Sequence, residues 1–204
     1  MSILDQFNLD GQVALVTGGS KGLGKEMAQA LAEAGAQVAV LSRNGEQSQA
    51  VAAGIQEATG NTCRGYSCDV TVEEQVNSTV EQILADFGQI DIAINNAGIN
   101  IRGHIDELDF AEFQHVQDVN VNGVWLACKA VVPHMKSRGY GRIINIGSAL
   151  SLIAIAERTP YNASKGAVLM MTRALALELA SHNITVNAIL PGSSLSQMAL
   201  ARWR

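Results

Sequence analysis

The sequence has little of what marks disulfide-stabilised, membrane-spanning or nucleic-acid-binding proteins. It contains only 3 cysteines, and the odd number and irregular spacing of Cys63, Cys68 and Cys128 favour neither a disulfide framework nor a metal site. It has no apolar run of about 18 residues and no signal-like start. Its 14 Lys and Arg residues are scattered and outnumbered by 19 Asp and Glu residues, so no basic surface for nucleic acid is expected. These absences predict a cytoplasmic protein with no metal, nucleic-acid or membrane partner.

What the sequence does contain is a regular alternation of two kinds of segment. Short apolar runs typical of buried parallel strands occupy Val13–Val16, Gln37–Leu41, Thr62–Ser67, Ile90–Ile94, Gly141–Ile146 and Thr185–Leu190. Between them, apolar residues recur at helical spacing over Leu23–Ala34, Glu46–Thr59, Val72–Phe87, Phe110–Ser137 and Tyr161–His182. This alternation predicts an α/β fold, with one domain over residues 1–204 built on a doubly wound parallel sheet of the Rossmann type. Ligands of such sheets bind beyond the carboxyl ends of the strands, where the strand order reverses.

The first expected strand leads directly into a glycine-rich loop with the sequence TGGSKGLG. Glycines let the backbone approach a pyrophosphate closely, and the helix that follows offers unpaired N–H groups and a positive dipole. The residues predicted to bind a dinucleotide here are Thr17, Gly18, Ser20, Lys21, Gly22, Leu23 and Gly24. The alternative is a turn whose glycines serve only close packing of the strand on the helix.

The end of the second expected strand indicates which dinucleotide binds. An NAD site usually has an acidic residue there for the ribose hydroxyls, but this chain has Ser42 and Arg43. A hydroxyl and a guanidinium suit a 2′-phosphate, and Lys21 in the glycine loop adds a second cation. The sequence therefore favours NADP(H) over NAD(H), unless Lys21 and Arg43 are merely solvated surface cations.

Three further residues predict an acid–base site at the same edge of the sheet. Ser148 follows the fifth expected strand, and Tyr161 and Lys165 lie four residues apart near the start of the next helix, where they share a face. With Thr159 as the expected N-cap and Pro160 as the first helical residue, Tyr161 falls in the first turn, where Lys165 and the helix dipole both favour a phenolate. Tyr161 is predicted to exchange a proton with a substrate oxygen held by Ser148, while a nicotinamide carries the hydride. A Tyr-x-x-x-Lys string alone is also compatible with an interfacial tyrosine and a solvated lysine.

In order and spacing, these motifs resemble those of the short-chain dehydrogenase/reductase family from about residue 5 to residue 192. The resemblance implies an NADP(H)-dependent oxidoreductase with Ser148, Tyr161 and Lys165 as its catalytic triad. It also implies that Asn120 bends its helix and holds a water leading to the lysine. Cofactor contacts are further implied for Asp69, Val70, Asn96, Ala97, Gly98, Pro191 and Gly192. Without the resemblance, the asparagines are ordinary turn residues and Asp69 is a helix cap.

The chain departs from the family after Gly192, where members usually continue with a mobile substrate loop, a helix and a last parallel strand. The sequence ends at Arg204, and Met198–Arg204 resembles a segment that normally follows that loop. The sequence therefore predicts a sheet without the family's C-terminal edge strand and places the substrate lid in doubt. In the family this strand also supports a tetramer, and the resemblance implies a homo-oligomer, either a dimer or a tetramer.

The substrate is suggested by the loop after the fourth expected strand. The segment INIR at residues 99–102 and the approach to Tyr161 resemble gluconate and related sugar-acid dehydrogenases. Arg102 is the candidate for pairing with a substrate carboxylate, unless it is a surface-loop arginine. Two alternatives stay open: a 3-oxoacyl-carrier-protein reductase, which shares these motifs, and a truncated cofactor-binding protein without turnover. A methyltransferase is disfavoured, because its chemistry gives no reason for Ser148, Tyr161 and Lys165 to occur together.

Overall fold

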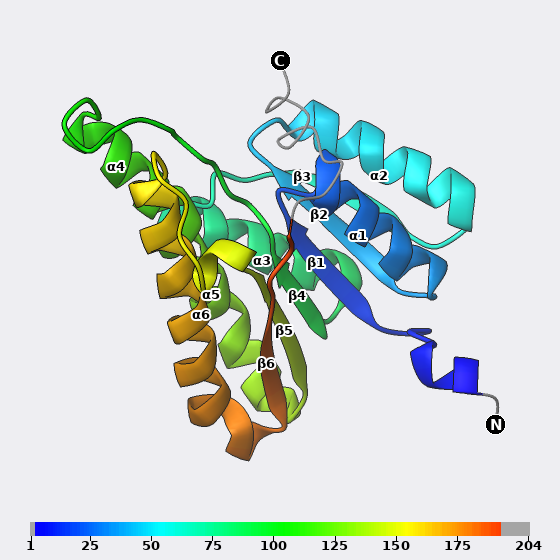
Figure 1. Ribbon diagram of the computed structural model, residues 1–204. Helices are drawn as coiled ribbons and strands as arrows, with labels where there is room; N and C mark the ends of the chain where they lie inside the picture. Colours follow the sequence, from blue (N-terminus) through cyan, green and yellow to red (C-terminus); the bar gives the residue numbers. More distant parts are fainter. Residues whose placement is uncertain (1–2, 193–204) are drawn as a thin grey trace.

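The computed structural model describes residues 3–192, which form one parallel sheet with helices on both faces (Figure 1). The strands are β1 (Val13–Thr17), β2 (Gln37–Ser42), β3 (Cys63–Ser67), β4 (Ile92–Asn95), β5 (Gly141–Ile146) and β6 (Ile184–Ile189). Their order is β3-β2-β1-β4-β5-β6, and every neighbouring pair is parallel. The predicted Rossmann-type sheet is confirmed, and each strand boundary lies within 2 residues of the predicted one.

Helices form one layer on each side of the sheet. They are α1 (Gly22–Glu33), α2 (Gly45–Thr59), α3 (Glu73–Phe87), α4 (Phe110–Gln117), α5 (Gly123–Arg138) and α6 (Thr159–Leu179), and short helical turns cover Ile3–Phe7, Asp118–Asn122, Ala149–Ser151 and Ala180–His182. Apolar side chains of α1 and α2 are buried against one face, and those of α3, α5 and α6 against the other. Figure 1 shows α1 and α2 on one side of the strands and α5 and α6 on the other. Because both faces are covered, the central strand β1 is buried over its whole length.

The helix expected over Phe110–Ser137 is divided in two. Residues Asp118–Asn122 form a π-helical turn between α4 and α5, a local widening of the helix that often occurs at functional sites. Asn120, within this turn, is fully buried. Its side-chain amide accepts a hydrogen bond from the Ile99 N–H at 2.8 Å and donates one to the Ile99 carbonyl oxygen at 2.9 Å. These bonds to a neighbouring loop account for the interruption, which the apolar spacing of the helix does not reveal.

The strand order reverses beside β1. From β1 the chain proceeds to β2 and β3 on one side and then crosses to β4, β5 and β6 on the other. In doubly wound sheets this reversal opens a crevice at the carboxyl ends of the two flanking strands. Those ends are Thr17 of β1 and Asn95 of β4, which are paired in register, and Asn145 near the end of β5 pairs with Asn95. We therefore expect the predicted site residues at the carboxyl ends of these strands.

The strand β6 forms the edge of the sheet on the side of β5, and residues 3–192 contain no strand beyond it. Met198–Arg204, the segment that resembles a later part of the family, lies outside the described residues. Between residues 3 and 192, no helix is long and apolar enough to cross a membrane.

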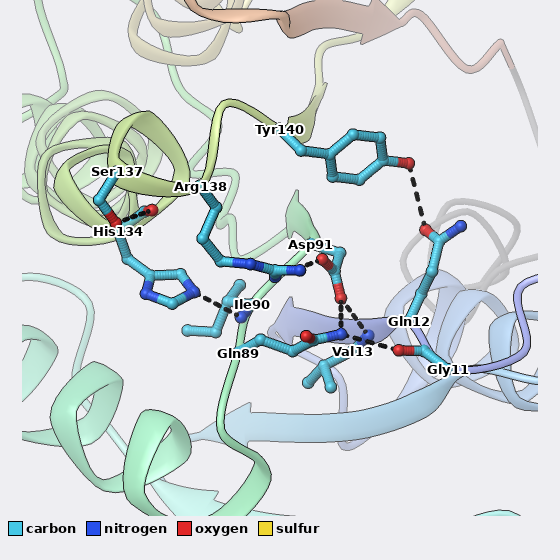
Figure 2. Close-up of polar contacts among 10 residues, drawn as sticks. All are labelled: Gly11, Gln12, Val13, Gln89, Ile90, Asp91, His134, Ser137, Arg138 and Tyr140. Atoms are coloured by element: carbon cyan, nitrogen blue, oxygen red, sulfur yellow. Dashed lines mark hydrogen bonds and ion pairs between the residues drawn. The ribbon is translucent and has the colours of Figure 1, made fainter.

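At the amino ends of the central strands, a polar cluster around the buried carboxylate of Asp91 ties β1 and β4 to α5 (Figure 2). One oxygen of Asp91 accepts hydrogen bonds from the Val13 N–H at 2.8 Å and from the Gln89 amide at 2.7 Å. The other pairs with Arg138, the last residue of α5, at 2.7 Å. This cluster holds together the first residues of the two central strands, at the opposite end from the predicted site.

Arg138→Met should destabilise the protein strongly, because it leaves the Asp91 carboxylate buried without its cation. The Asp91 side chain is 3% exposed and that of Arg138 is 35% exposed. Breaking a buried pair costs about 3–5 kcal/mol, so with one partner partly hydrated we expect a loss of about 3 kcal/mol in urea unfolding. Lys129→Met is the control, because it removes a cation from an exposed pair with Glu73 and should cost less than about 1 kcal/mol. Equal losses in the two variants would contradict a special role for the buried pair.

Candidate active site

The carboxyl ends of β1 and β4 are closely packed against each other. The Thr17 hydroxyl accepts hydrogen bonds from the backbone N–H groups of Asn96 and Ala97, at 3.0 and 3.2 Å. The Asn96 amide donates to the carbonyl oxygens of Thr17 and Gly18, both at 3.1 Å. Gly18 has φ +63°, and a side chain there would lie 2.9 Å from the Ala97 Cα, so both conformation and space require glycine. The glycine loop and the segment Asn96–Gly98 are therefore brought together.

The glycine loop ends in a helix N-terminus that no side chain caps. α1 begins at Gly22, and its N-cap residue, Lys21, makes no side-chain capping hydrogen bond. Gly24 packs against the Gly18 carbonyl group so closely that no side chain would fit, whereas nothing lies within 4 Å of the position of a Cβ on Gly22. Lys21 and Leu23 are exposed. Among residues 3–192, nothing thus fills the space beside Gly22 at the start of α1, a position that suits the pyrophosphate of a dinucleotide.

The side chains expected to meet a 2′-phosphate lie around the start of α2. Ser42 is half-buried, and its hydroxyl shares a hydrogen bond with the hydroxyl of Ser48 at 2.7 Å. Ser20 of the glycine loop donates to Gln47 of α2 at 3.1 Å, which joins the loop to this helix. Arg43 is exposed. These contacts bring Ser20 and the strand end that carries Ser42 and Arg43 to the same helix, and their binding to a phosphate stays a prediction.

Asp69 follows β3 and lies near Arg43. Its carboxylate accepts hydrogen bonds from the N–H and the hydroxyl of Thr71, at 3.0 and 2.7 Å. Burial alone would raise the pKa of Asp69, but these bonds and the charges of Arg43 and His115 hold it below its usual value. Asp69 therefore stabilises the turn that precedes α3, but the N-cap of α3 is Val72, so the alternative interpretation of Asp69 as the helix cap is wrong. Val70 is buried, and contacts of either residue with an adenine stay predictions.

Ser148 and Tyr161 meet at the carboxyl end of β5. Ser148 is the N-cap of the turn Ala149–Ser151, where its hydroxyl accepts a hydrogen bond from the Leu150 N–H at 3.1 Å. Burial raises the pKa of Tyr161, while a hydrogen bond with Ser148 and the positive charge of Arg158 act in the opposite direction. Burial wins, so the pKa of Tyr161 lies above its usual value, whereas the sequence predicted a net shift toward the phenolate. The local sequence does not show how deeply the ring is buried.

Lys165 lies one helical turn after Tyr161 and is 4% exposed. Its ammonium group donates to the Ile146 carbonyl oxygen at 2.7 Å and lies 5.6 Å from the centre of the Tyr161 ring. Burial lowers the pKa of Lys165 to about 8, because the charged form loses its hydration. The ammonium group is therefore charged at neutral pH and loses its charge in mildly alkaline solution.

Asn120 connects the π-helical turn to α6, the helix that carries Tyr161 and Lys165. Besides its bonds to the preceding loop, its amide donates to the Ser164 hydroxyl at 2.9 Å, and that hydroxyl donates to the Tyr161 carbonyl oxygen at 2.8 Å. A Cβ on Gly98 would lie 3.3 Å from the side-chain oxygen of Asn120 and 3.6 Å from the Lys165 nitrogen. The predicted residues Asn120, Tyr161 and Lys165 therefore belong to one polar group, and the water expected there stays a prediction.

The start of α6 differs by one residue from the prediction. Arg158 is the N-cap, Thr159 is the first helical residue, and Pro160 follows it. The assignment of Thr159 as the cap was wrong, because helical bonding starts one residue earlier, with the N–H of Asn162 donating to the Arg158 carbonyl oxygen at 2.8 Å. Tyr161 still lies in the first turn, as predicted.

Sequence reasoning missed two residues that hold this helix in place. Gln117, at the end of α4, donates to the Pro160 carbonyl oxygen at 2.9 Å, directly before Tyr161. Ser164 bridges Asn120 and Tyr161. Gln117 lies three residues before Asn120, and Ser164 directly precedes Lys165. This closeness in sequence to predicted site residues is the only signal that could have indicated them.

The predicted turn Pro191-Gly192 lies beside Ser148. The Pro191 carbonyl oxygen accepts a hydrogen bond from the Ala149 N–H at 2.9 Å. Nothing lies within 4 Å of the position of a Cβ on Gly192. Within residues 3–192, the space beside Gly192 is therefore unfilled and the turn lies next to Ser148, while its place beside a nicotinamide stays a prediction.

Arg102 is exposed on the loop that follows β4. The next residue, Gly103, donates its N–H to the Glu157 carbonyl oxygen at 3.1 Å. The loop that carries Arg102 is thus hydrogen-bonded to the segment leading into Tyr161. An exposed side chain on this loop could contact a substrate bound near Tyr161. Pairing of Arg102 with a substrate carboxylate stays a prediction.

Comparison with known proteins identifies the family. The family model described as short chain dehydrogenase matches residues 12–203. The chain belongs to the short-chain dehydrogenase family. Gluconate 5-dehydrogenase of Gluconobacter oxydans (strain 621H) is 39% identical over 198 residues, which are 97% of this chain and 77% of that protein. The chain is therefore an oxidoreductase that acts on CH–OH groups with a nicotinamide cofactor, as its motifs predicted.

Solved structures of related proteins have the same fold. A gluconate 5-dehydrogenase from Burkholderia cenocepacia J2315, in complex with NADP and tartrate, superposes with a TM-score of 0.90 at 38% identity, over 94% of this chain and 74% of that one. An NAD⁺-bound xylitol dehydrogenase superposes with a TM-score of 0.91 at 37% identity, over 95% of this chain and 75% of that one. Relatives of similar identity thus hold different dinucleotides, so family membership alone leaves the choice between them open.

Proposed function

We propose that this short-chain dehydrogenase is NADP(H)-dependent and interconverts a carbonyl and a secondary alcohol on a sugar acid of the gluconate/5-ketogluconate type. The observation that carries the proposal is the meeting of Ser148 and Tyr161 beside the buried Lys165, at the edge where the glycine loop opens. The likeness to gluconate 5-dehydrogenases supports the substrate class. The decisive test is NADPH oxidation with a panel of keto sugar acids.

In this mechanism Ser148 donates a hydrogen bond to the carbonyl oxygen of the substrate. Tyr161 gives its hydroxyl proton to the same oxygen during reduction and takes it back during oxidation. A nicotinamide dinucleotide held by the glycine loop would supply the hydride chemistry at the adjacent carbon. Lys165, charged at neutral pH, favours the ionised form of Tyr161 and is the candidate for holding the nicotinamide ribose. Asn120, through Ser164, keeps the first turn of α6 in register with these groups.

We expect NADPH to bind more tightly than NADH, because Ser42 and Arg43 stand where an NAD site has an acid. Ser42→Asp should reverse this preference, since a carboxylate repels the 2′-phosphate and accepts hydrogen bonds from ribose hydroxyls. Fluorescence titration with both cofactors measures the effect, and Ser78→Asp, on the exposed side of α3, is the control. Equal affinities of the unaltered protein for NADPH and NADH would refute the assignment.

Arg102 is the proposed partner of the substrate carboxylate. Arg102→Ala should raise the KM for 5-ketogluconate about ten- to hundredfold. The reason is that a hydrogen bond to a charged group contributes about 1.5–3 kcal/mol to binding. The KM for an uncharged ketone should stay unchanged, which makes that ketone the internal control. If the KM for 5-ketogluconate is also unchanged, Arg102 is a solvent-exposed loop residue.

Two other functions compete with the proposal. A 3-oxoacyl-carrier-protein reductase would share the catalytic residues and reduce acetoacetyl thioesters in preference to keto sugar acids. A cofactor-binding protein without turnover would bind NADPH and oxidise it with no member of either panel. We further propose that residues 1–204 form one domain and that the protein is cytoplasmic. We also propose that it is a homo-oligomer, which size determination in solution tests.

A further inference from the structure

We propose that Ser151 is a positioning residue of the site, which orients Ser148 so that the Ser148 hydroxyl proton stays available for the substrate oxygen. The inference rests on the proposed role of Ser148 in binding that oxygen. It adds to the site a residue that the sequence motifs do not include.

The backbone on both sides of Ser148 is hydrogen-bonded to the end of β6 and the turn after it. Gly147 donates its N–H to the Ile189 carbonyl oxygen at 2.8 Å, and Ala149 donates to the Pro191 carbonyl oxygen at 2.9 Å. Ser148 lies between them in an extended conformation, with φ −161° and ψ 160°. Because its neighbours are fixed in this way, the direction of the Ser148 side chain depends on how its own N–H and hydroxyl are bonded.

Ser151 and Ser148 bind each other reciprocally. The Ser148 N–H donates to the Ser151 hydroxyl oxygen at 3.2 Å, and the Ser151 N–H donates to the Ser148 carbonyl oxygen at 2.8 Å. The Ser148 hydroxyl oxygen accepts the Leu150 N–H at 3.1 Å. Together these bonds form a capping box, in which the N-cap residue and the third residue of the turn satisfy donors of the same short turn. A Cβ on Gly147 would lie 3.0 Å from the Ser151 hydroxyl oxygen, so this hydroxyl packs directly on the backbone before Ser148.

The capping box determines which bonds of the Ser148 hydroxyl remain for the reaction. A hydroxyl has one O–H donor and two acceptor lone pairs. The Leu150 N–H occupies one lone pair, which leaves the O–H donor for Tyr161 and for a substrate oxygen beside it. An N–H that donates to the Ser148 oxygen also strengthens the bond that the hydroxyl itself donates. Without the Ser151 hydroxyl, the Ser148 N–H loses its partner and the Ser148 side chain is less firmly held in this orientation.

The test is a double-mutant cycle, measured by single-turnover NADPH oxidation with a keto sugar acid. Ser151→Ala should lower the rate about threefold to tenfold, the usual contribution of one neutral hydrogen bond. The KM should change little, because the bond from Ser148 to the substrate oxygen strengthens in the transition state. In a Ser148→Ala background, Ser151→Ala should cause no further loss, since the hydroxyl through which Ser151 acts is absent.

Two further variants complete the cycle. Ser151→Thr keeps a hydroxyl at this position and should recover the rate that Ser151→Ala loses. Ser137→Ala is the matched control, because the Ser137 hydroxyl also bonds a backbone group three residues away, the His134 carbonyl oxygen at 2.8 Å. It should leave the rate unchanged. An unchanged rate in Ser151→Ala overturns the inference, and so does an equal loss with and without the Ser148 hydroxyl, which would make Ser151 important only for the stability of the loop.

Amide hydrogen exchange at Leu150, followed by NMR, separates failure of this inference from failure of the proposed function. The Leu150 N–H donates to the Ser148 hydroxyl, so its exchange rate reports where that hydroxyl lies. Ser151→Ala should speed this exchange, as Ser148→Ala does, whereas Ser137→Ala should not. An unchanged exchange in Ser151→Ala overturns the inference with or without turnover. Faster exchange in a protein that reduces no keto sugar acid would support the positioning of Ser148 and contradict the proposed function alone.

Discussion

Tyr161→Phe should bind NADPH as the unaltered protein does and lose turnover by a factor of about 10²–10⁴, the usual contribution of general acid–base catalysis. The substitution removes only the hydroxyl that contacts Ser148 and keeps the ring that packs 5.6 Å from the Lys165 ammonium. Single-turnover NADPH oxidation with a keto sugar acid measures the loss, and fluorescence titration measures cofactor binding.

Tyr140→Phe is the matched control for this experiment. Its hydroxyl donates a hydrogen bond to the Gln12 side chain at 3.4 Å (Figure 2). This bond lies at the amino ends of the strands, away from Tyr161. Removing that hydroxyl should leave turnover unchanged. Near-normal turnover of Tyr161→Phe on a substrate that the unaltered protein reduces would mean that the proton comes from another group and that the proposed mechanism is wrong.

Lys165→Met should change two properties at once, because Lys165 is proposed both to hold the nicotinamide ribose and to favour the phenolate. NADPH binding should weaken about ten- to hundredfold, the value of a hydrogen bond from a charged group. The pH optimum of alcohol oxidation should move upward, since removing a cation raises the pKa of a neighbouring phenol. Methionine is close to lysine in length and apolar, so it suits a side chain that is 4% exposed.

The two effects of Lys165→Met are separated in a Tyr161→Phe background. There the second substitution should still weaken NADPH binding, because the ribose contact does not involve the tyrosine hydroxyl. Unchanged affinity together with an unchanged pH optimum in the single variant would place Lys165 outside the site. A loss of affinity alone would leave the ionisation of Tyr161 to groups other than Lys165.

Much of the architecture could be read from local patterns. Buried parallel strands are continuously apolar and crossover helices are apolar at helical spacing, so both were located within a few residues. The uncertain places were those governed by long-range contacts. Asn120 interrupts a helix because it bonds to Ile99, 21 residues earlier, and Arg138 stabilises Asp91 from 47 residues away. Neither contact leaves a periodic trace in the sequence.

The sequence by itself determined how strands and helices succeed one another along the chain, where the glycine loop lies, and that Ser148, Tyr161 and Lys165 are the candidate acid–base residues. Spacing and residue type carry this information locally. Only the tertiary structure decided how those side chains behave. Burial of Tyr161 outweighs the charges that favour its ionisation, and burial of Lys165 brings its pKa to about 8. Both effects depend on how much water the surrounding elements exclude. That quantity is set by the packing of segments distant in sequence.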